Sequence, residues 1–164
     1  MTEPSPIDSL GPTGVHVARN VQRLRETRNL SFADLSRELA KIGRHIPTLG
    51  LRKIESLRRR VDTDDLVALA IVFDVSPATL LMPHAYDMEE WSTGRSALTD
   101  PDAKYRFEVV WDWLVADAPL VVGAESPNGR QMHAFRLNAV PEHAYMRKQL
   151  GFDADGRARR HGDD

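Results

Sequence analysis

The hydrophobic pattern of residues 30 to 57 predicts two helices joined by a turn. In the first of them, Phe32, Leu35, Leu39 and Ile42 fall at i, i+3, i+7 and i+10, so they share one face of a helix with 3.6 residues per turn. A helix with one apolar face is expected to lie on a protein core.

The residues around this apolar stripe supply the signals that begin and end helices. Ser31 and Asp34 have the spacing of an N-cap pair, in which a hydroxyl and a carboxylate accept from amides of the first turn. Gly43 ends the helix. Pro47 fits the start of the next helix, because proline lacks an amide that the first turn does not need.

The second helix, predicted from Thr48 to Leu57, has two unlike faces. Leu51 and Ile54 lie on the inward face. The outward face carries polar and basic side chains and one leucine: Thr48, Leu49, Arg52, Lys53 and Ser56. A short helix of this kind suits the major groove of DNA, where base edges present acceptors between two rows of phosphates.

Two more segments of the first half have helical periodicity, and they cover residues 15–27 and 62–73. Asp62 and Asp65 give the second of these segments an N-cap pair. Ser76 and Pro77 then begin a short fifth helix that runs to Leu81 and ends before Pro83. Five helices, with three apolar stripes between them, predict a compact and mainly α domain over residues 15–83.

The remaining segments are less regular. The expected division is a flexible arm at 1–14, the helical domain at 15–83, a linker at 84–99, an aromatic-rich C-terminal region at 100–150 and a disordered tail at 151–164. We expect the C-terminal region to be smaller and helical, with one helix to about residue 117 and another from 130 to 150 that Pro141 interrupts. Residues 105–115 also alternate with period two, so a strand competes with the first of these helices.

Charge is divided unevenly along the chain. The formal net charge is -2, but residues 15–60 contain twelve Lys and Arg and four Asp and Glu, a local charge of +8. Residues 61–164 carry -8 and the first fourteen carry -2. Such asymmetry indicates that the basic part meets a polyanion. It is also compatible with an acidic half that only maintains solubility.

Composition limits the compartment and the chemistry. Cysteine is absent, which excludes a disulfide framework and a thiolate metal site. No apolar run approaches the roughly 20 residues that cross a bilayer, and the N-terminus lacks the layout of a secretion signal. We therefore expect a cytoplasmic protein.

Motifs of the common catalytic and metal sites are missing. No phosphate-binding glycine loop, zinc helix motif or serine elbow occurs, and the six histidines form no i, i+4 pair. Asp62, Asp64 and Asp65 lack the glycine-containing loop that calcium requires. The sequence predicts no enzyme, no cofactor and no metal site.

The combined pattern resembles the DNA-binding domain of the phage-repressor and Cro-like helix-turn-helix family, also called the xenobiotic-response-element type. The matching residues are Leu24-Arg25, Leu30-Ser31, Leu35-Ser36, Leu51, Ile54-Glu55, Asp65-Leu66 and Leu69-Ala70. The resemblance implies a five-helix, lambda-repressor-like domain that reads DNA with its third helix. It also implies a structural ion pair between Arg25 and Glu55.

On this basis, we expect base contacts from Thr48, Leu49, Arg52 and Lys53. We expect phosphate contacts from Ser31, Arg44, His45, Arg58, Arg59 and Arg60. Two features depart from the family pattern. Phe32 stands where many relatives carry glutamine, and because it cannot donate to a phosphate we expect it to join the core. The segment from Lys41 to His45 also lengthens the turn before the recognition helix.

The leading hypothesis is a sequence-specific DNA-binding transcriptional regulator, a homodimeric repressor whose partner is double-stranded DNA. A second hypothesis is a protein-interaction module that uses a helix-turn-helix fold. A third keeps DNA binding and assigns the C-terminal region to a small ligand or an antagonist protein. Nothing in the residues identifies such a ligand.

Overall fold

The computed structural model describes residues 10–84, 92–120, 127–139 and 141. The protein is mainly helical, as predicted, and divides into two compact units, Met1–Trp111 and Asp112–Asp164. Most of the expected arm at 1–14 and all of the expected tail at 151–164 lie outside the described residues.

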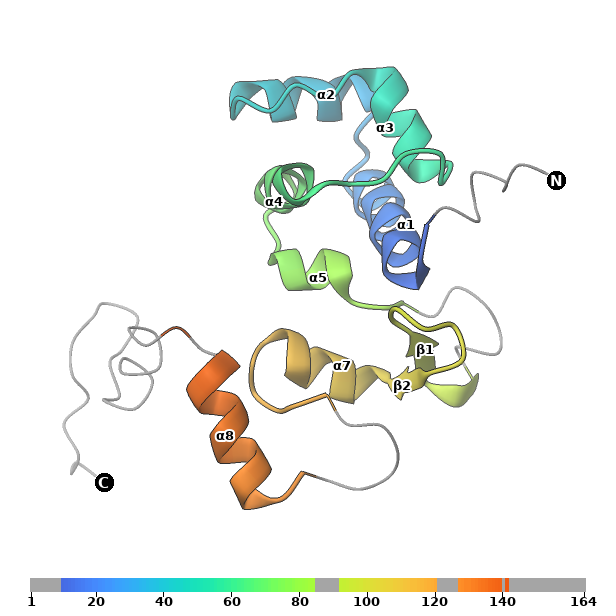
Figure 1. The fold of residues 1–164 in the computed structure, drawn as a ribbon. Helices are drawn as coiled ribbons and strands as arrows, with labels where there is room; N and C mark the ends of the chain where they lie inside the picture. The colour runs from blue at the N-terminus through green and yellow to red at the C-terminus, as the bar shows by residue number, and fades with distance from the viewer. Residues whose placement is uncertain (1–9, 85–91, 121–126, 140, 142–164) are drawn as a thin grey trace, which may run out of the picture. The chain divides into compact units, whose positions relative to one another are not determined.

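The first unit contains the helices α1 to α5 (Figure 1). They are α1 (Pro12–Thr27), α2 (Phe32–Lys41), α3 (Thr48–Glu55), α4 (Thr63–Val72) and α5 (Pro77–Leu81). All five lie where the sequence pattern predicted helices, and no end differs from the prediction by more than three residues. Helix α2 ends at Lys41, so the residues that lengthen the turn after it are not helical.

The helix starts follow the local sequence. The Ser31 hydroxyl accepts from the Asp34 amide, and the Asp34 carboxylate accepts from the Ser31 amide, both at 3.1 Å. This is the reciprocal arrangement of a capping box, and it confirms the N-cap predicted there. At α4, the Asp62 carboxylate accepts from the Asp65 amide at 2.7 Å.

One hydrophobic core holds the five helices together. Its fully buried side chains include Val21, Leu35, Leu39, Ile46, Leu51, Ile54, Leu69, Phe73 and Leu80. Around it, α1 packs against α3 and α5, α2 against α3 and α4, and α4 against α5. These packings close into a ring in which each helix lies between two others.

A short hairpin is attached to the start of α1. Strand β1 (Arg95–Ala97) pairs antiparallel with β2 (Lys104–Arg106), with Ser96 opposite Tyr105. The Thr13 amide and hydroxyl both donate to the Leu98 carbonyl, at 2.9 and 2.8 Å. Nε2 of the buried His16 donates to the Ala97 carbonyl at 2.9 Å.

Because the hairpin is bonded to α1, the observed division of the chain differs from the expected one. The expected linker at 84–99 contains β1, and the last residues of the expected arm at 1–14 belong to α1. The first unit extends to Trp111 and not to residue 83. The difference arises because hydrogen bonds between residues more than 80 positions apart leave no local hydrophobic pattern.

The aromatic-rich segment contains both competing structures. Residues 104–106 form β2, and α7 (Phe107–Leu114) follows directly, in place of a single helix to residue 117. Val110 of α7 is fully buried, whereas Trp111 and Trp113 are 40% and 39% exposed. The segment with period-two alternation therefore begins in a strand and continues as a helix.

The second unit contains α8 (Gly129–Ala139), in the first part of the helix predicted from 130 to 150. Asn128 caps it, since its side chain accepts from the Gln131 amide at 3.0 Å while the Gln131 side chain accepts from the Asn128 amide at 2.9 Å. Residues after Pro141 lie outside the described part.

The hairpin attachment predicts a measurable contribution to stability. Thr13→Val keeps the shape of the side chain but removes the hydroxyl that donates to Leu98, so the free energy of unfolding should fall by about 1 kcal/mol. Thr99→Val, at an exposed neighbour, should change it by less than about 0.5 kcal/mol. Urea denaturation of both variants tests this, and equal effects would contradict a stabilising role for the bond.

Candidate nucleic-acid interface

Helix α3 has one buried face and one exposed face. Leu51 and Ile54 are fully buried against α1 and α2. The residues expected to contact bases, Thr48, Leu49, Arg52 and Lys53, are all exposed, and Leu49 is 62% exposed. The exposure that a reading face requires is therefore present, while contact with bases stays a prediction.

An ion pair ties α3 to α1. Arg25 donates from Nε to Oε1 of Glu55 at 2.6 Å and from Nη2 to Oε2 at 2.8 Å, and it also donates to the Leu30 carbonyl at 3.1 Å. The two side chains are only 12% and 7% exposed. The hydrogen bond to Glu55 raises the pKa of Arg25 above its ordinary value. The pair implied by the family resemblance is thus present in the structure.

Phe32 lies beside this ion pair at the first position of α2. The Arg25 guanidinium lies over its ring at 4.3 Å from the centroid, and the Arg52 guanidinium lies over the same ring at 4.8 Å. The ring is half-buried and packs against the core, as expected. It also holds an arginine of the exposed face, which sequence reasoning missed.

The segment between α2 and α3 is ordered by backbone contacts. Gly43 has φ of 82° and donates to the Ala40 carbonyl, so it adopts the left-handed conformation that glycine favours after a helix. Ile46 is buried, and its carbonyl accepts from the Ser36 hydroxyl at 2.7 Å. The longer turn is thus anchored at its apolar residue, with His45 exposed.

A second cluster of charges surrounds Asp65, whose side chain is 1% exposed. Arg44 donates from Nε to Oδ1 at 2.6 Å, and Arg59 donates from Nη2 to Oδ2 at 2.7 Å. Arg44 also bonds Asp62 through Nη2. The bond to Asp65 raises the pKa of Arg44 above its ordinary value.

This cluster changes the interpretation of two expected phosphate contacts. Arg44 and Arg59 donate to a buried carboxylate, so part of their charge is already neutralised within the molecule. The sequence did contain a signal for the cluster. Asp65 precedes Leu69 by four residues and therefore lies on the inward side of α4, where a carboxylate requires cationic partners.

The capping box also limits what Ser31 can offer to a phosphate. Its amide donates to Asp34, and its hydroxyl lies 2.5 Å from the same carboxylate. These hydrogen bonds hold the pKa of Asp34 below its ordinary value, so the carboxylate carries its charge at neutral pH. A phosphate at this helix end would meet a negative charge. Of the expected phosphate contacts, His45, Arg58 and Arg60 are the exposed cationic or imidazole side chains.

Gly50 lets the Asp65 cluster approach α3 closely. A methyl group at position 50 would lie 2.6 Å from Nη1 of Arg59 and 3.2 Å from Cγ2 of Ile46. Because the Arg59 guanidinium is held by Asp65, a larger residue at this position would have to displace it. The glycine within this short helix is explained by space and not by backbone conformation.

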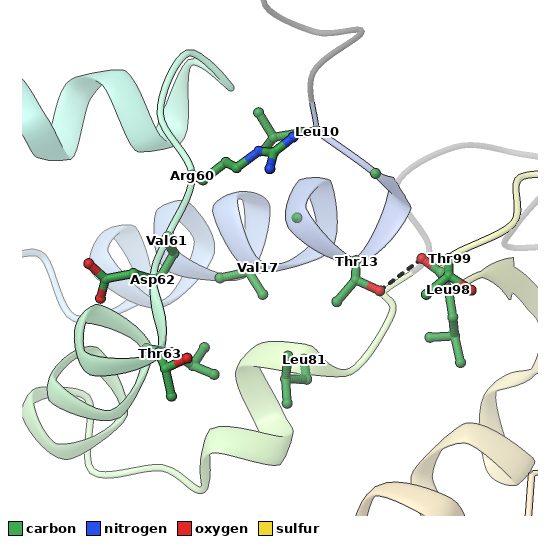
Figure 2. A pocket seen from close by; sticks show the side chains of 13 residues that line it. Leu10, Thr13, Val17, Arg60, Val61, Asp62, Thr63, Leu81, Leu98 and Thr99 are labelled. Atoms are coloured by element: carbon green, nitrogen blue, oxygen red, sulfur yellow. Dashed lines mark hydrogen bonds between the residues drawn. The ribbon is translucent and has the colours of Figure 1, made fainter.

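A hollow of about 420 Å³ lies in the first unit, beside the loop between α3 and α4. Figure 2 shows the side chains that line it. Val17 of α1, Val61 of the loop and Leu98 supply apolar lining, and Thr13, Arg60 and Asp62 supply polar groups. The volume is in the range of small-molecule sites. A molecule held there would touch residues 60–62 of the segment between α3 and α4, whereas the third hypothesis assigned a ligand to the C-terminal region.

The residues that the structure describes contain no group of three or more His, Cys, Asp or Glu side chains placed to hold a metal ion. None of their helices is both long enough and apolar enough to span a bilayer.

Comparisons with known proteins identify no relative. No family model, no curated protein and no solved structure matches this chain.

The ion pair between α1 and α3 predicts a large and asymmetric effect on stability. Glu55→Ala leaves the nearly buried Arg25 guanidinium without its main partner, so the free energy of unfolding should fall by about 3 kcal/mol. Glu26→Ala is the matched control, because Glu26 is 56% exposed at 3.3 Å from the same arginine; it should cost less than about 1 kcal/mol. Equal losses in thermal or urea denaturation would contradict the assignment.

The Asp62 cap predicts a dependence of stability on acid. The hydrogen bond from the Asp65 amide, followed by the charges of Arg44 and Arg59, holds the pKa of Asp62 below its ordinary value of 3.8. A lowered pKa in the folded state gives stability that is complete above the unfolded value and is lost as pH falls through the folded value. The free energy of unfolding should therefore decline below about pH 4.

Asp62→Asn tests this dependence, because asparagine retains the cap but cannot titrate. Its free energy of unfolding should fall less steeply between about pH 4 and pH 2 than that of the unsubstituted chain. Asp64→Asn, at an exposed neighbour whose side chain does not cap α4, should keep the original slope. A slope that Asp62→Asn leaves unchanged would refute the role of the cap.

Proposed function

We propose that this chain is a sequence-specific DNA-binding transcriptional regulator in which α1 to α5 form a helix-turn-helix domain. The observation that carries the proposal is the division of α3 into two faces. Leu51 and Ile54 are buried in the core. The opposite face is exposed and carries Thr48, Leu49, Arg52 and Lys53. Arginine can donate two hydrogen bonds to guanine, and the methyl of thymine accepts an apolar contact, so the four residues offer base readout.

The charge around α3 supports a polyanionic partner. Lys53, Arg58 and Arg60 are exposed on α3 and on the segment that leaves it. Their place at the end of the helix suits contact with the backbone flanking a groove, which adds affinity without sequence preference. Because Arg44 and Arg59 are engaged by Asp65, we assign them to the support of this surface and not to phosphate binding.

We further propose that the regulator acts as a homodimer and represses by occupying its operator. A dimer of such domains reads two half-sites about 34 Å apart, one turn of the duplex. The exposed indoles of Trp111 and Trp113 in α7 favour this helix as the contact between copies, since tryptophan is enriched at protein interfaces. The same exposure favours the second candidate, a protein-interaction module, whose binding would not require DNA.

Selection of bound sites from random duplex DNA tests the proposal, and the molar mass of the complex on the selected site gives the number of protomers. Arg52→Ala should flatten the preference at one base-pair position in each half-site, a loss of about 1 to 3 kcal/mol in discrimination. Arg58→Ala should weaken binding to all sequences and reduce the slope of log affinity against log salt by about one unit.

Arg95→Ala is the control for charge, because Arg95 is an exposed arginine of β1, outside α3 and the segment that follows it. It should leave both the preference and the salt slope unchanged. Failure to enrich any sequence would overturn the proposed function. Enrichment of one sequence that Arg52→Ala leaves equally preferred would show that a different surface reads the DNA.

A further inference from the structure

The ring of Phe32 connects the structural ion pair to the exposed face of α3. Arg25 is fixed by its two bonds to Glu55 and one to the Leu30 carbonyl, and its guanidinium lies 4.3 Å from the centroid of the ring. The ring is half-buried against the core, so its own position is restricted. The Phe32 ring therefore has a restricted position beside the exposed face of α3.

Arg52 rests on that ring. Its guanidinium lies 4.8 Å from the centroid of Phe32 although the side chain as a whole is exposed. Among the described residues, the Phe32 ring is the group on which the Arg52 guanidinium rests. An arginine stacked on an aromatic ring keeps the N–H groups at its edge available for hydrogen bonds.

We infer that Phe32 is a positioning residue for Arg52, setting the orientation in which this arginine meets a base. The inference rests on the proposed function. An exposed arginine loses rotamer freedom when it binds, which lowers the affinity. A ring that already restricts the guanidinium reduces this loss, but only for the base edge that fits the restricted orientation. Phe32 would then contribute to discrimination between base pairs without touching DNA.

The competing interpretation is that Phe32 only fills space in the core. Leucine would serve that purpose without a π face, and tyrosine would retain the π face, so the two substitutions separate the roles. A role in the core alone predicts that Phe32→Leu lowers stability but leaves the ratio of affinities for two DNA sequences unchanged.

The test measures two affinities for each protein by fluorescence anisotropy. One duplex carries the selected site, and the other differs at the base pair whose preference Arg52→Ala removes. Phe32→Leu should lower the ratio of the two affinities by about two- to five-fold, whereas Phe32→Tyr should keep it. The double variant, Phe32→Leu with Arg52→Ala, should have the same ratio of affinities as Arg52→Ala alone, because the ring acts through that arginine.

A measurement without DNA accompanies the affinities. In nuclear magnetic resonance spectra, the side-chain protons of Arg52 should carry ring-current shifts that are lost in Phe32→Leu and kept in Phe32→Tyr. Circular dichroism confirms that each variant is folded. An unchanged affinity ratio in folded Phe32→Leu, with Arg52→Ala still flattening the preference, would overturn the inference alone. If the unsubstituted chain selects no sequence, the proposed function fails and this inference fails with it.

Discussion

The bidentate ion pair between Arg25 and Glu55 is the interaction on which the geometry of the first unit depends. Both side chains are nearly buried, so each requires the other to offset its loss of hydration. The pair fixes α3 against α1 while hydrophobic burial supplies most of the stability of the core. Because hydrophobic contact has no direction and bidentate hydrogen bonds do, the ion pair specifies how α3 is rotated and therefore which of its residues face outward.

A second buried carboxylate, Asp65, shows that charge counted along a sequence overstates charge available to a partner. Residues 15–60 carry +8, yet several of their cations are paired within the molecule: Arg25 with Glu55, Arg37 with Asp34, Lys41 with Glu38, and Arg44 and Arg59 with Asp65. Asp65 belongs to the segment counted as acidic. The electrostatic surface of the first unit is thus set by which arginines the carboxylates leave exposed, and these include Arg52 and Arg58.

The helices of the first unit could be predicted because their signals are local. Ser31 and Asp34, or Asp62 and Asp65, lie three residues apart, and apolar residues repeat once per turn. The two faces of α3 followed from the same periodicity. The hairpin and the contact between Phe32 and Arg52 could not be predicted in this way, because each joins residues from separate elements whose approach depends on the whole fold. For Asp65, the periodicity places the carboxylate on the inward side of α4, but the identity of its partners, Arg44 and Arg59, depends on the whole fold.

The attachment of β1 to α1 constrains how this chain could have been assembled in evolution. A buried imidazole at position 16 has its carbonyl acceptor at residue 97, and the first turn of α1 donates to residue 98. A recombination point between the five helices and the hairpin would remove the carbonyl acceptors of these groups. The two segments would therefore be inherited together, and exchange of the remaining C-terminal sequence between proteins would be tolerated only beyond the hairpin.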